Sequence, residues 1–310
     1  MKTNDNFEQR REDYRNRVNA ALNDCLPAPE IIPRQLHAAM RDAVLRGGKR
    51  LRPLLCYAAA EATGVPARLM DAPAAAVELI HCYSLVHDDL PCMDDDELRR
   101  GQPTIHRIYG EDVALLAGDA LQTLAWEVLA AHPSLMERND ARVALSELFA
   151  QCSGSTGMVG GQELDLRGGP EPDLAELEHA YRTKTGGLFR AAVLSPVCVQ
   201  PEMPLNFRHA LEQFADALGL AFQIRDDFND KESDAQALIS TESSRLPSWV
   251  ARFGEQAARE RLEELVGAMQ EACQTFGAAG AGLRWLTGFI GASVPGAAAA
   301  DTATTAPPGR

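Results

Sequence analysis

The chain has 310 residues, of which 45% are apolar and 24% are charged, a composition typical of a soluble globular protein rather than a disordered or fibrous one. Its 30 Lys and Arg against 44 Asp and Glu give a net charge of −14, which disfavours nucleic acid and anionic lipid as partners. An anionic ligand would therefore need a local basic pocket.

The cellular location is predicted from cysteine use and from the absence of targeting signals. Seven cysteines are scattered without a CxxC pair, which indicates neither a zinc knuckle nor a disulfide framework and favours a reducing compartment. No uncharged apolar run approaches the roughly 20 residues that span a bilayer. The first residues also lack the apolar stretch of a secretory signal. We predict a cytoplasmic protein without stable membrane insertion.

Apolar residues recur at helical spacing throughout the chain, as in 74–80 and 262–269, and alternating β-branched runs are almost absent. This pattern predicts an all-α fold with about ten helices between residues 31 and 290. We expect residues 1–290 to form one domain and the Ala-, Thr- and Pro-rich segment 291–310 to be a disordered tail. Helix stops are expected at the Gly- and Pro-containing segments 47–48, 64–66, 101–103, 168–170 and 201–204.

Five aspartates lie within nine residues at the end of one apolar helical segment. Residues 74–87 run directly into them. The carboxyl end of a helix is already negative, so clustered carboxylates there are unfavourable unless a cation neutralises them. A metal site is one interpretation, and a solvated acidic loop is the alternative. The five are Asp88, Asp89, Asp94, Asp95 and Asp96.

The same arrangement recurs 138 positions later, where the apolar segment 214–225 ends in Asp226, Asp227 and Asp230. Asp226 and Asp230 are four apart and therefore share one side of a helix. Two apolar helices that end in DDxxxxD and DDxxD would face each other across a cavity. Hard oxygen ligands of this kind suit Mg²⁺, with Mn²⁺ as the alternative, and such a site implies a phosphate-bearing ligand.

The basic side chains that a phosphate ligand needs occur beside other helix ends. Lys49 and Arg52 follow a Gly-Gly break, Arg99 and Arg100 follow the first Asp cluster, and Lys184 precedes a threonine. Guanidinium nitrogens match phosphate oxygens in pairs. Each group taken alone is also explained by a surface charge cluster. The Gly-Gly segment is not a Walker A loop, because it lacks the required spacing and no strand precedes it.

Taken together, these motifs resemble the trans-isoprenyl diphosphate synthase family, and within it the bacterial farnesyl diphosphate synthases, with geranylgeranyl diphosphate synthases as near relatives. The resemblance covers residues 30–230 and implies an all-α bundle around a central active-site cavity, normally a homodimer. It also implies condensation of dimethylallyl or geranyl diphosphate with isopentenyl diphosphate to give farnesyl diphosphate. The motifs are GGKRLRP (47–53), HCYSLVHDDLPCMDDDELRRGQPT (81–104), GDALQ (118–122), GGQELDL (160–166), KTGGLF (184–189) and FQIRDDFND (222–230).

The resemblance implies roles for individual residues. Three Mg²⁺ ions would be held by Asp88, Asp89, Asp94, Asp226, Asp227 and Asp230. The allylic diphosphate and its reacting end would contact Arg99, Lys184, Thr185 and Gln223. A metal-free pocket for isopentenyl diphosphate would be formed by Lys49, Arg52, His81 and Arg100. Leaving-group stabilisation by Mg²⁺ and cationic side chains requires no protein nucleophile.

Product length is expected to depend on Tyr83 and Ser84, which precede Asp88 by five and four positions. A tyrosine there, together with the DDxxxxD spacing, resembles the pattern of synthases that make a C15 product. A C20 product is the alternative for the enzyme, and a plain core aromatic is the alternative for Tyr83.

The sequence departs from the family pattern after Asp230. No lysine follows Lys231, the stretch 232–245 is short and weakly basic, and Arg245 is the candidate for the cation that closes the site. Two competing interpretations remain. A non-catalytic partner subunit is disfavoured by the intact Asp motifs, and a terpene cyclase is disfavoured by the second diphosphate pocket.

Overall fold

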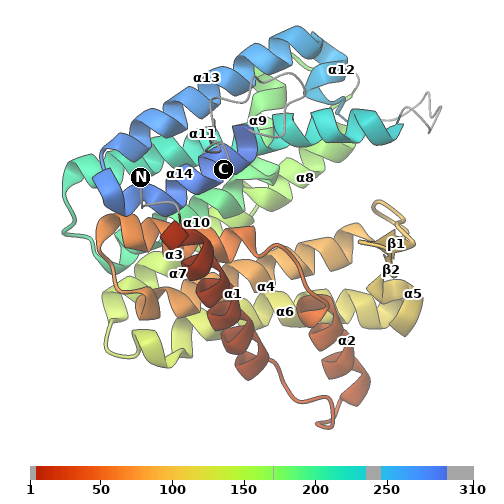
Figure 1. Cartoon of the computed structure of the whole chain (residues 1–310). Coiled ribbons are helices and arrows are strands. Elements are labelled where there is room, and N and C mark those ends of the chain that lie inside the picture. The colour runs from red at the N-terminus through yellow and green to blue at the C-terminus, as the bar shows by residue number, and fades with distance from the viewer. Residues whose placement is uncertain (1–4, 170, 235–245, 292–310) are drawn as a thin grey trace, which may run out of the picture.

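The computed structural model describes residues 5–169, 171–234 and 246–291, and in this part of the chain it is helical apart from one short antiparallel hairpin (Figure 1). The predicted all-α class is confirmed. The elements in chain order are α1 (Asp5–Cys25), α2 (Arg34–Leu45), α3 (Leu51–Thr63), η1 (Ala67–Met70), α4 (Asp71–Asp88), β1 (Leu98–Arg99), β2 (Gln102–Pro103), α5 (Ile105–Tyr109), α6 (Glu111–Ala131), η2 (Pro133–Leu135), α7 (Asn139–Ser153), α8 (Met158–Arg167), α9 (Leu174–Lys184), α10 (Gly186–Val199), α11 (Leu205–Asp234), α12 (Trp249–Phe253), α13 (Glu255–Gln274), η3 (Gly277–Gly280) and α14 (Ala281–Gly291).

The described part of residues 31–290 contains thirteen α-helices, α2 to α14, where the sequence predicts about ten. Two of the short ones, α5 and α12, are each separated from the next helix by one glycine, Gly110 or Gly254. These glycines have φ angles of +93° and +88°, which a residue without a side chain adopts readily. A single glycine within a helical pattern thus ends a helix at each of these positions. The helix stops expected from the sequence were longer Gly- and Pro-containing segments and did not include Gly110 or Gly254.

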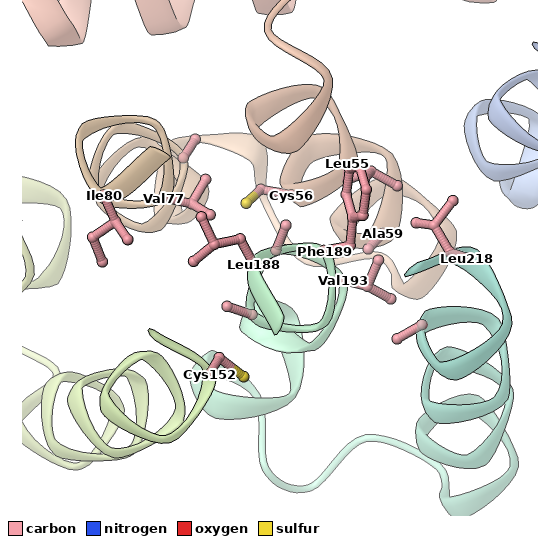
Figure 2. Packing of buried hydrophobic residues seen from close by; sticks show 14 of the residues in the cluster. Leu55, Cys56, Ala59, Val77, Ile80, Cys152, Leu188, Phe189, Val193 and Leu218 are labelled. Atoms are coloured by element: carbon pink, nitrogen blue, oxygen red, sulfur yellow. The ribbon is translucent and has the colours of Figure 1, made fainter. Parts of the chain in front are cut away.

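Helix α10 lies at the centre of the apolar core, surrounded by α3, α4, α7 and α11 (Figure 2). Its side chains Leu188, Phe189 and Val193 are fully buried, and Leu55 of α3 and Leu218 of α11 belong to the same cluster. Because α10 begins directly after Lys184 and Thr185, burial of this helix fixes the position of both residues at its N-terminal end. The described helices share this single core.

Among the described residues, two helical segments are long and apolar enough to cross a membrane by length and composition alone. In Ala67–Asp88, which contains α4, 78% of the apolar window is buried inside the bundle, as expected of a core helix. In α6 the buried share is 44%, and Leu115 and Leu116 are about half exposed. The first helix is thus explained by the core, and the second leaves an apolar surface.

The C-terminal ends of α4 and α11, which carry the two Asp motifs, lie on the same side of the bundle as the hairpin (Figure 1). This placement brings together motifs that are far apart in the sequence. Gly291, the first residue of the expected tail, ends α14, and the rest of that tail, 292–310, lies outside the described part of the chain, as does Arg245.

A close backbone approach between α10 and α11 at Gly186 and Gly219 leads to a stability prediction. A Cβ atom added at Gly219 would lie 2.3 Å from Cα of Gly186. Gly219→Ala should therefore lower the free energy of unfolding by about 1–3 kcal/mol, measured by urea denaturation. The matched control is Gly267→Ala in α13, where no atom lies within 4 Å of the added carbon and stability should rise by up to about 1 kcal/mol. Equal stability of the two variants would contradict the close packing.

Candidate active site

The first Asp motif folds back on the end of α4. The backbone N–H of Asp94 donates to the carbonyl of Asp88 at 2.8 Å. This bond brings the last aspartate of DDxxxxD beside the first. Burial raises the pKa of Asp88 to about 6; the charge of Lys184 opposes this shift and that of Asp94 adds to it. Two carboxylates that are hard to ionise together form a site that a divalent cation would stabilise.

Asp89, the next residue in the motif, faces a different partner. It is 3% exposed, and its Oδ1 lies 2.6 Å from nitrogens of Arg99 on the hairpin. Burial raises the pKa of Asp89, and the arginine opposes that rise. Asp89 and Arg99 both line a small cavity of about 130 Å³. The sequence groups Asp89 with the metal ligands, whereas the structure pairs it with the guanidinium that the family resemblance assigns to substrate.

In the second Asp motif, too, the two adjacent aspartates have different surroundings. Asp226 lines a cavity of about 610 Å³, and Arg225 donates to its Oδ1 at 2.7 Å. Asp227 is 6% exposed and accepts hydrogen bonds from Tyr181 and from the backbone N–H of Trp249. The structure therefore does not place Asp227 on the cavity wall with Asp226. Asp230 lies on α11, but its side chain is outside the described part of the structure.

The cavity beside Asp226 is strongly basic. It collects the cationic residues that the sequence singles out, except Lys184, together with the buried carboxylate of Glu78 from α4 and two partly exposed side chains of α11, Gln223 and Asp226. Arg52 is half-buried with its guanidinium 4.6 Å from the ring centre of Phe189, and its buried Nε has no hydrogen-bond partner. Burial lowers the pKa of Arg52 to about 10, so it remains charged at neutral pH. The cavity is lined by Gly48, Lys49, Arg50, Leu51, Arg52, Glu78, His81, Leu85, Arg99, Arg100, Thr185, Phe222, Gln223 and Asp226.

Arg50 lines this cavity but serves the fold. Its Nη1 donates to Glu78 at 2.6 Å, its Nη2 donates to the carbonyl of Val44, and its Nε donates to Asn19. The side chain is 4% exposed, so the ion pair with Glu78 is buried. These contacts tie the start of α3 to α4 and hold the backbone that carries Lys49 and Arg52.

A second, more apolar cavity of about 480 Å³ adjoins the basic one. Asp88 and Lys184 are among its polar lining, and Tyr83, Ser84 and Met158 are among the rest. The hydroxyl of Ser84 donates to the carbonyl of His81 at 2.9 Å. Four residues line both cavities and form the wall between them: Arg52, His81, Leu85 and Thr185.

Hydrogen bonds to neighbouring residues hold Lys184, Thr185 and Arg100, and one of these neighbours, Asp165, was not assigned a role from the sequence. Lys184 donates to Asp165 at 2.6 Å, and Thr185 donates to Oε1 of Gln223 at 2.7 Å. Arg100 donates to the carbonyl of Gly47, which joins the hairpin to the Gly-Gly segment. Asp165 lies inside the GGQELDL motif, and this position is the sequence feature that could have identified it. Tyr181, which donates to Asp227, lies in none of the motifs.

No group of three Asp, Glu, His or Cys side chains in the described residues gathers closely enough to hold a metal ion unaided. Mg²⁺ in phosphate sites uses one or two carboxylates, water and substrate oxygens. The donor set at Asp88 and Asp226, all oxygen and facing adjoining cavities, therefore fits a cation that a diphosphate shares.

Comparison with known proteins identifies the family. The Polyprenyl synthetase family matches residues 33–274. Farnesyl diphosphate synthase of Escherichia coli (strain K12) is 44% identical over 234 residues, covering 73% of this chain and 78% of the relative. A chloroplastic geranylgeranyl pyrophosphate synthase of Catharanthus roseus is 39% identical over 267 residues, covering 84% and 74%.

Solved structures agree in fold. A geranyltransferase from Legionella pneumophila superposes with a TM-score of 0.83 at 32% identity, covering 92% of this chain and 96% of that structure. An FPP/GFPP synthase from Zymomonas mobilis gives 0.82 at 34% identity, covering 92% and 98%. The chain belongs to the polyprenyl synthetase family and is a trans-prenyltransferase.

The wall between the cavities generates a prediction for His81. Burial, together with the charge of Arg52, lowers the pKa of this imidazole well below 6.5. His81 should therefore remain neutral from pH 8 down to pH 6.5. The measurement is ¹H–¹³C NMR of histidine-labelled protein, with the signal assigned by its loss in His81→Gln. A titration midpoint at or above 6.5 would contradict the burial of the ring.

Proposed function

We propose that this chain is a farnesyl diphosphate synthase that condenses an allylic diphosphate, dimethylallyl or geranyl, with isopentenyl diphosphate. The observation that carries the proposal is the wall of four residues shared by a basic cavity and an apolar one. In this reaction the allylic carbon loses its diphosphate and is joined to the alkene end of isopentenyl diphosphate, which then loses a proton to the released diphosphate. The reaction therefore needs two charged binding regions and one apolar space for the growing chain. Support also comes from the farnesyl diphosphate synthases among the relatives.

Asp88, Asp94, Asp226 and Asp230 would hold Mg²⁺ together with the diphosphate of the allylic substrate, with three ions as the proposed number and Mn²⁺ as a possible replacement. The bound metal would stabilise the negative charge that develops on the leaving diphosphate. Lys184 and Arg99 supply further positive charge on the protein side, and each is already fixed by a carboxylate, Asp165 or Asp89.

The protein side chains bind and orient, and none is required as a nucleophile. Lys49, Arg52 and Arg100 would bind the diphosphate of isopentenyl diphosphate in the basic cavity, with neutral His81 beside them. Thr185 and Gln223 would lie at the reacting end of the allylic substrate, where ionisation gives an allylic carbocation. Exclusion of water by the apolar cavity protects that cation.

The C15 product is proposed from the wall of the apolar cavity. Tyr83 is 5% exposed and lines that cavity together with Ser84, so its ring occupies space that a longer chain would need. A C20 product is the second candidate, because geranylgeranyl pyrophosphate synthases are also among the relatives.

A cytoplasmic homodimer is the proposed state of the enzyme. Helix α6 presents Leu115 and Leu116 about half exposed, and neighbouring α5 exposes Ile108. A second copy would remove this apolar surface from water.

The direct test is an assay of the purified chain with labelled isopentenyl diphosphate and each allylic primer in turn. Farnesyl diphosphate is the expected product with either primer. Geranylgeranyl diphosphate would favour the second candidate. No incorporation by the chain alone would contradict the proposal and favour a non-catalytic partner subunit.

Loss of an Asp carboxylate from the cavity wall should abolish turnover. Asp88→Ala and Asp226→Ala should each lower kcat/KM by at least about 100-fold, because a group is removed from a preorganised electrostatic site. The matched control is Asp140→Ala, an exposed aspartate in the first turn of α7, which should keep wild-type activity. Near-normal turnover in both cavity variants would exclude the metal assignment.

Arg52→Ala should separate the two substrates. Since Arg52 lies in the basic cavity, its removal should raise the KM for isopentenyl diphosphate by about tenfold or more and change the KM for the allylic primer less. Arg68→Ala, an exposed arginine in η1, is the control for loss of a positive charge. A larger effect on the primer would show that the two pockets are assigned the wrong way round.

A further inference from the structure

Asp226 and Asp227 are adjacent on α11 but have different surroundings. Successive residues on a helix point about 100° apart, so one side chain can line a cavity while the next is buried between helices. Asp226 lines the basic cavity. Asp227 is 6% exposed and is not part of the lining of either large cavity.

The carboxylate of Asp227 joins three helices. Its Oδ2 accepts from the hydroxyl of Tyr181 on α9 at 2.8 Å and from the backbone N–H of Trp249 at the start of α12 at 2.7 Å. Its Oδ1 accepts from Nε2 of Gln223, one turn earlier on α11, at 3.4 Å. A metal ion would have to compete with these donors for both oxygens.

The hydrogen bonds continue from Asp227 into the substrate cavities. Gln223 donates through its amide nitrogen to Asp227, so its amide oxygen faces Thr185 and accepts from that hydroxyl at 2.7 Å. Thr185 lines both cavities, and Gln223 lines the basic one. The charge of Asp227 thus decides which end of the Gln223 amide faces Thr185.

Tyr181 is the donor that is easiest to remove. Burial, with the charge of Asp227 adding to it, raises the pKa of this phenol, so it remains protonated and donates. Tyr181 stands one turn before Lys184 on α9. Its bond to Asp227 therefore aligns the helix that carries Lys184 with the helix that carries Gln223.

The two adjacent aspartates of the first motif also have different surroundings. Asp88 lines the apolar cavity, whereas Asp89 is buried against Arg99. In both motifs the second aspartate bonds to a neighbouring group of the proposed site and does not line either of the two large cavities.

We propose that Asp227 is a positioning residue that orients Gln223 and Thr185 and aligns α9 with α11, and that it does not bind the metal. This inference rests on the proposed function. It predicts that the two aspartates of the pair differ in what their loss removes: metal-dependent diphosphate binding for Asp226, and the rate of the reaction for Asp227.

The experiment compares Asp226→Asn, Asp227→Asn and Tyr181→Phe with wild type by two readouts. Calorimetry with inorganic pyrophosphate, with and without Mg²⁺, measures metal-dependent binding without turnover. Asp226→Asn should weaken that binding by about tenfold or more. Asp227→Asn and Tyr181→Phe should bind as wild type does.

Steady-state kinetics supplies the second readout. Asp227→Asn and Tyr181→Phe should lower kcat by about 10- to 100-fold while both KM values stay near wild type, because misplaced groups cost rate. The double variant should lose less than the product of the two single effects, since both act on one network. Tyr14→Phe is the matched control and should keep wild-type kcat, because it removes a tyrosine bond to Glu61 and neither residue lines the two large cavities.

Three results would overturn the inference. They are loss of Mg²⁺-dependent pyrophosphate binding in Asp227→Asn equal to that in Asp226→Asn, a wild-type kcat in Tyr181→Phe, and fully multiplicative effects in the double variant. If Asp227→Asn fails to fold, Tyr181→Phe, which keeps the carboxylate, still decides the matter. A wild-type protein that binds Mg²⁺-pyrophosphate but forms no prenyl product would refute the proposed function, and the binding comparison would still test the role of Asp227.

Discussion

The constraint on which the rest of the site depends is the cost of burying several carboxylates at the ends of two apolar helices. A buried carboxylate is tolerated when hydrogen bonds or an opposite charge compensate it. Asp89 has Arg99, Asp226 has Arg225, and Asp227 has Tyr181 and the start of α12. Asp88 is the least compensated of them, and its pKa of about 6 shows the cost. In the proposed mechanism, a cation shared with a diphosphate would remove that cost.

The same buried carboxylates hold two of the cations that we propose to bind substrate. Lys184 and Arg99 each form an ion pair with a carboxylate, so both are held before substrate arrives. Arg52 instead rests on the ring of Phe189 and keeps an Nε without a hydrogen-bond partner. A diphosphate oxygen would satisfy that buried donor. The basic cavity therefore favours an anion, whereas the adjoining cavity is lined mainly by apolar surface.

The sequence was sufficient for the features that depend on local pattern. Helical periodicity predicted the all-α class. The two acidic helix ends were expected to face one cavity, and the structure places them on one side of the bundle with Asp88 and Asp226 lining two adjoining cavities. The sequence was insufficient where the role of a residue depends on which side of its helix packs against the neighbouring helices. Asp227 and Asp226 are equivalent in sequence, and only packing against Tyr181 and Trp249, 46 and 22 positions away, separates them. Likewise, single glycines such as Gly110 ended helices because the bundle requires a turn there, and periodicity alone does not show that requirement.

The central claim is that the two acidic helix ends hold one shared group of metal ions over a diphosphate. The most direct measurement is anomalous diffraction from crystals grown with Mn²⁺ and an unreactive allylic diphosphate analogue. The account predicts anomalous peaks between Asp88 and Asp94 on one side and Asp226 on the other, each also bonded to diphosphate oxygens. Diphosphate bound without metal at these carboxylates, or metal bound only outside the two cavities, would contradict it.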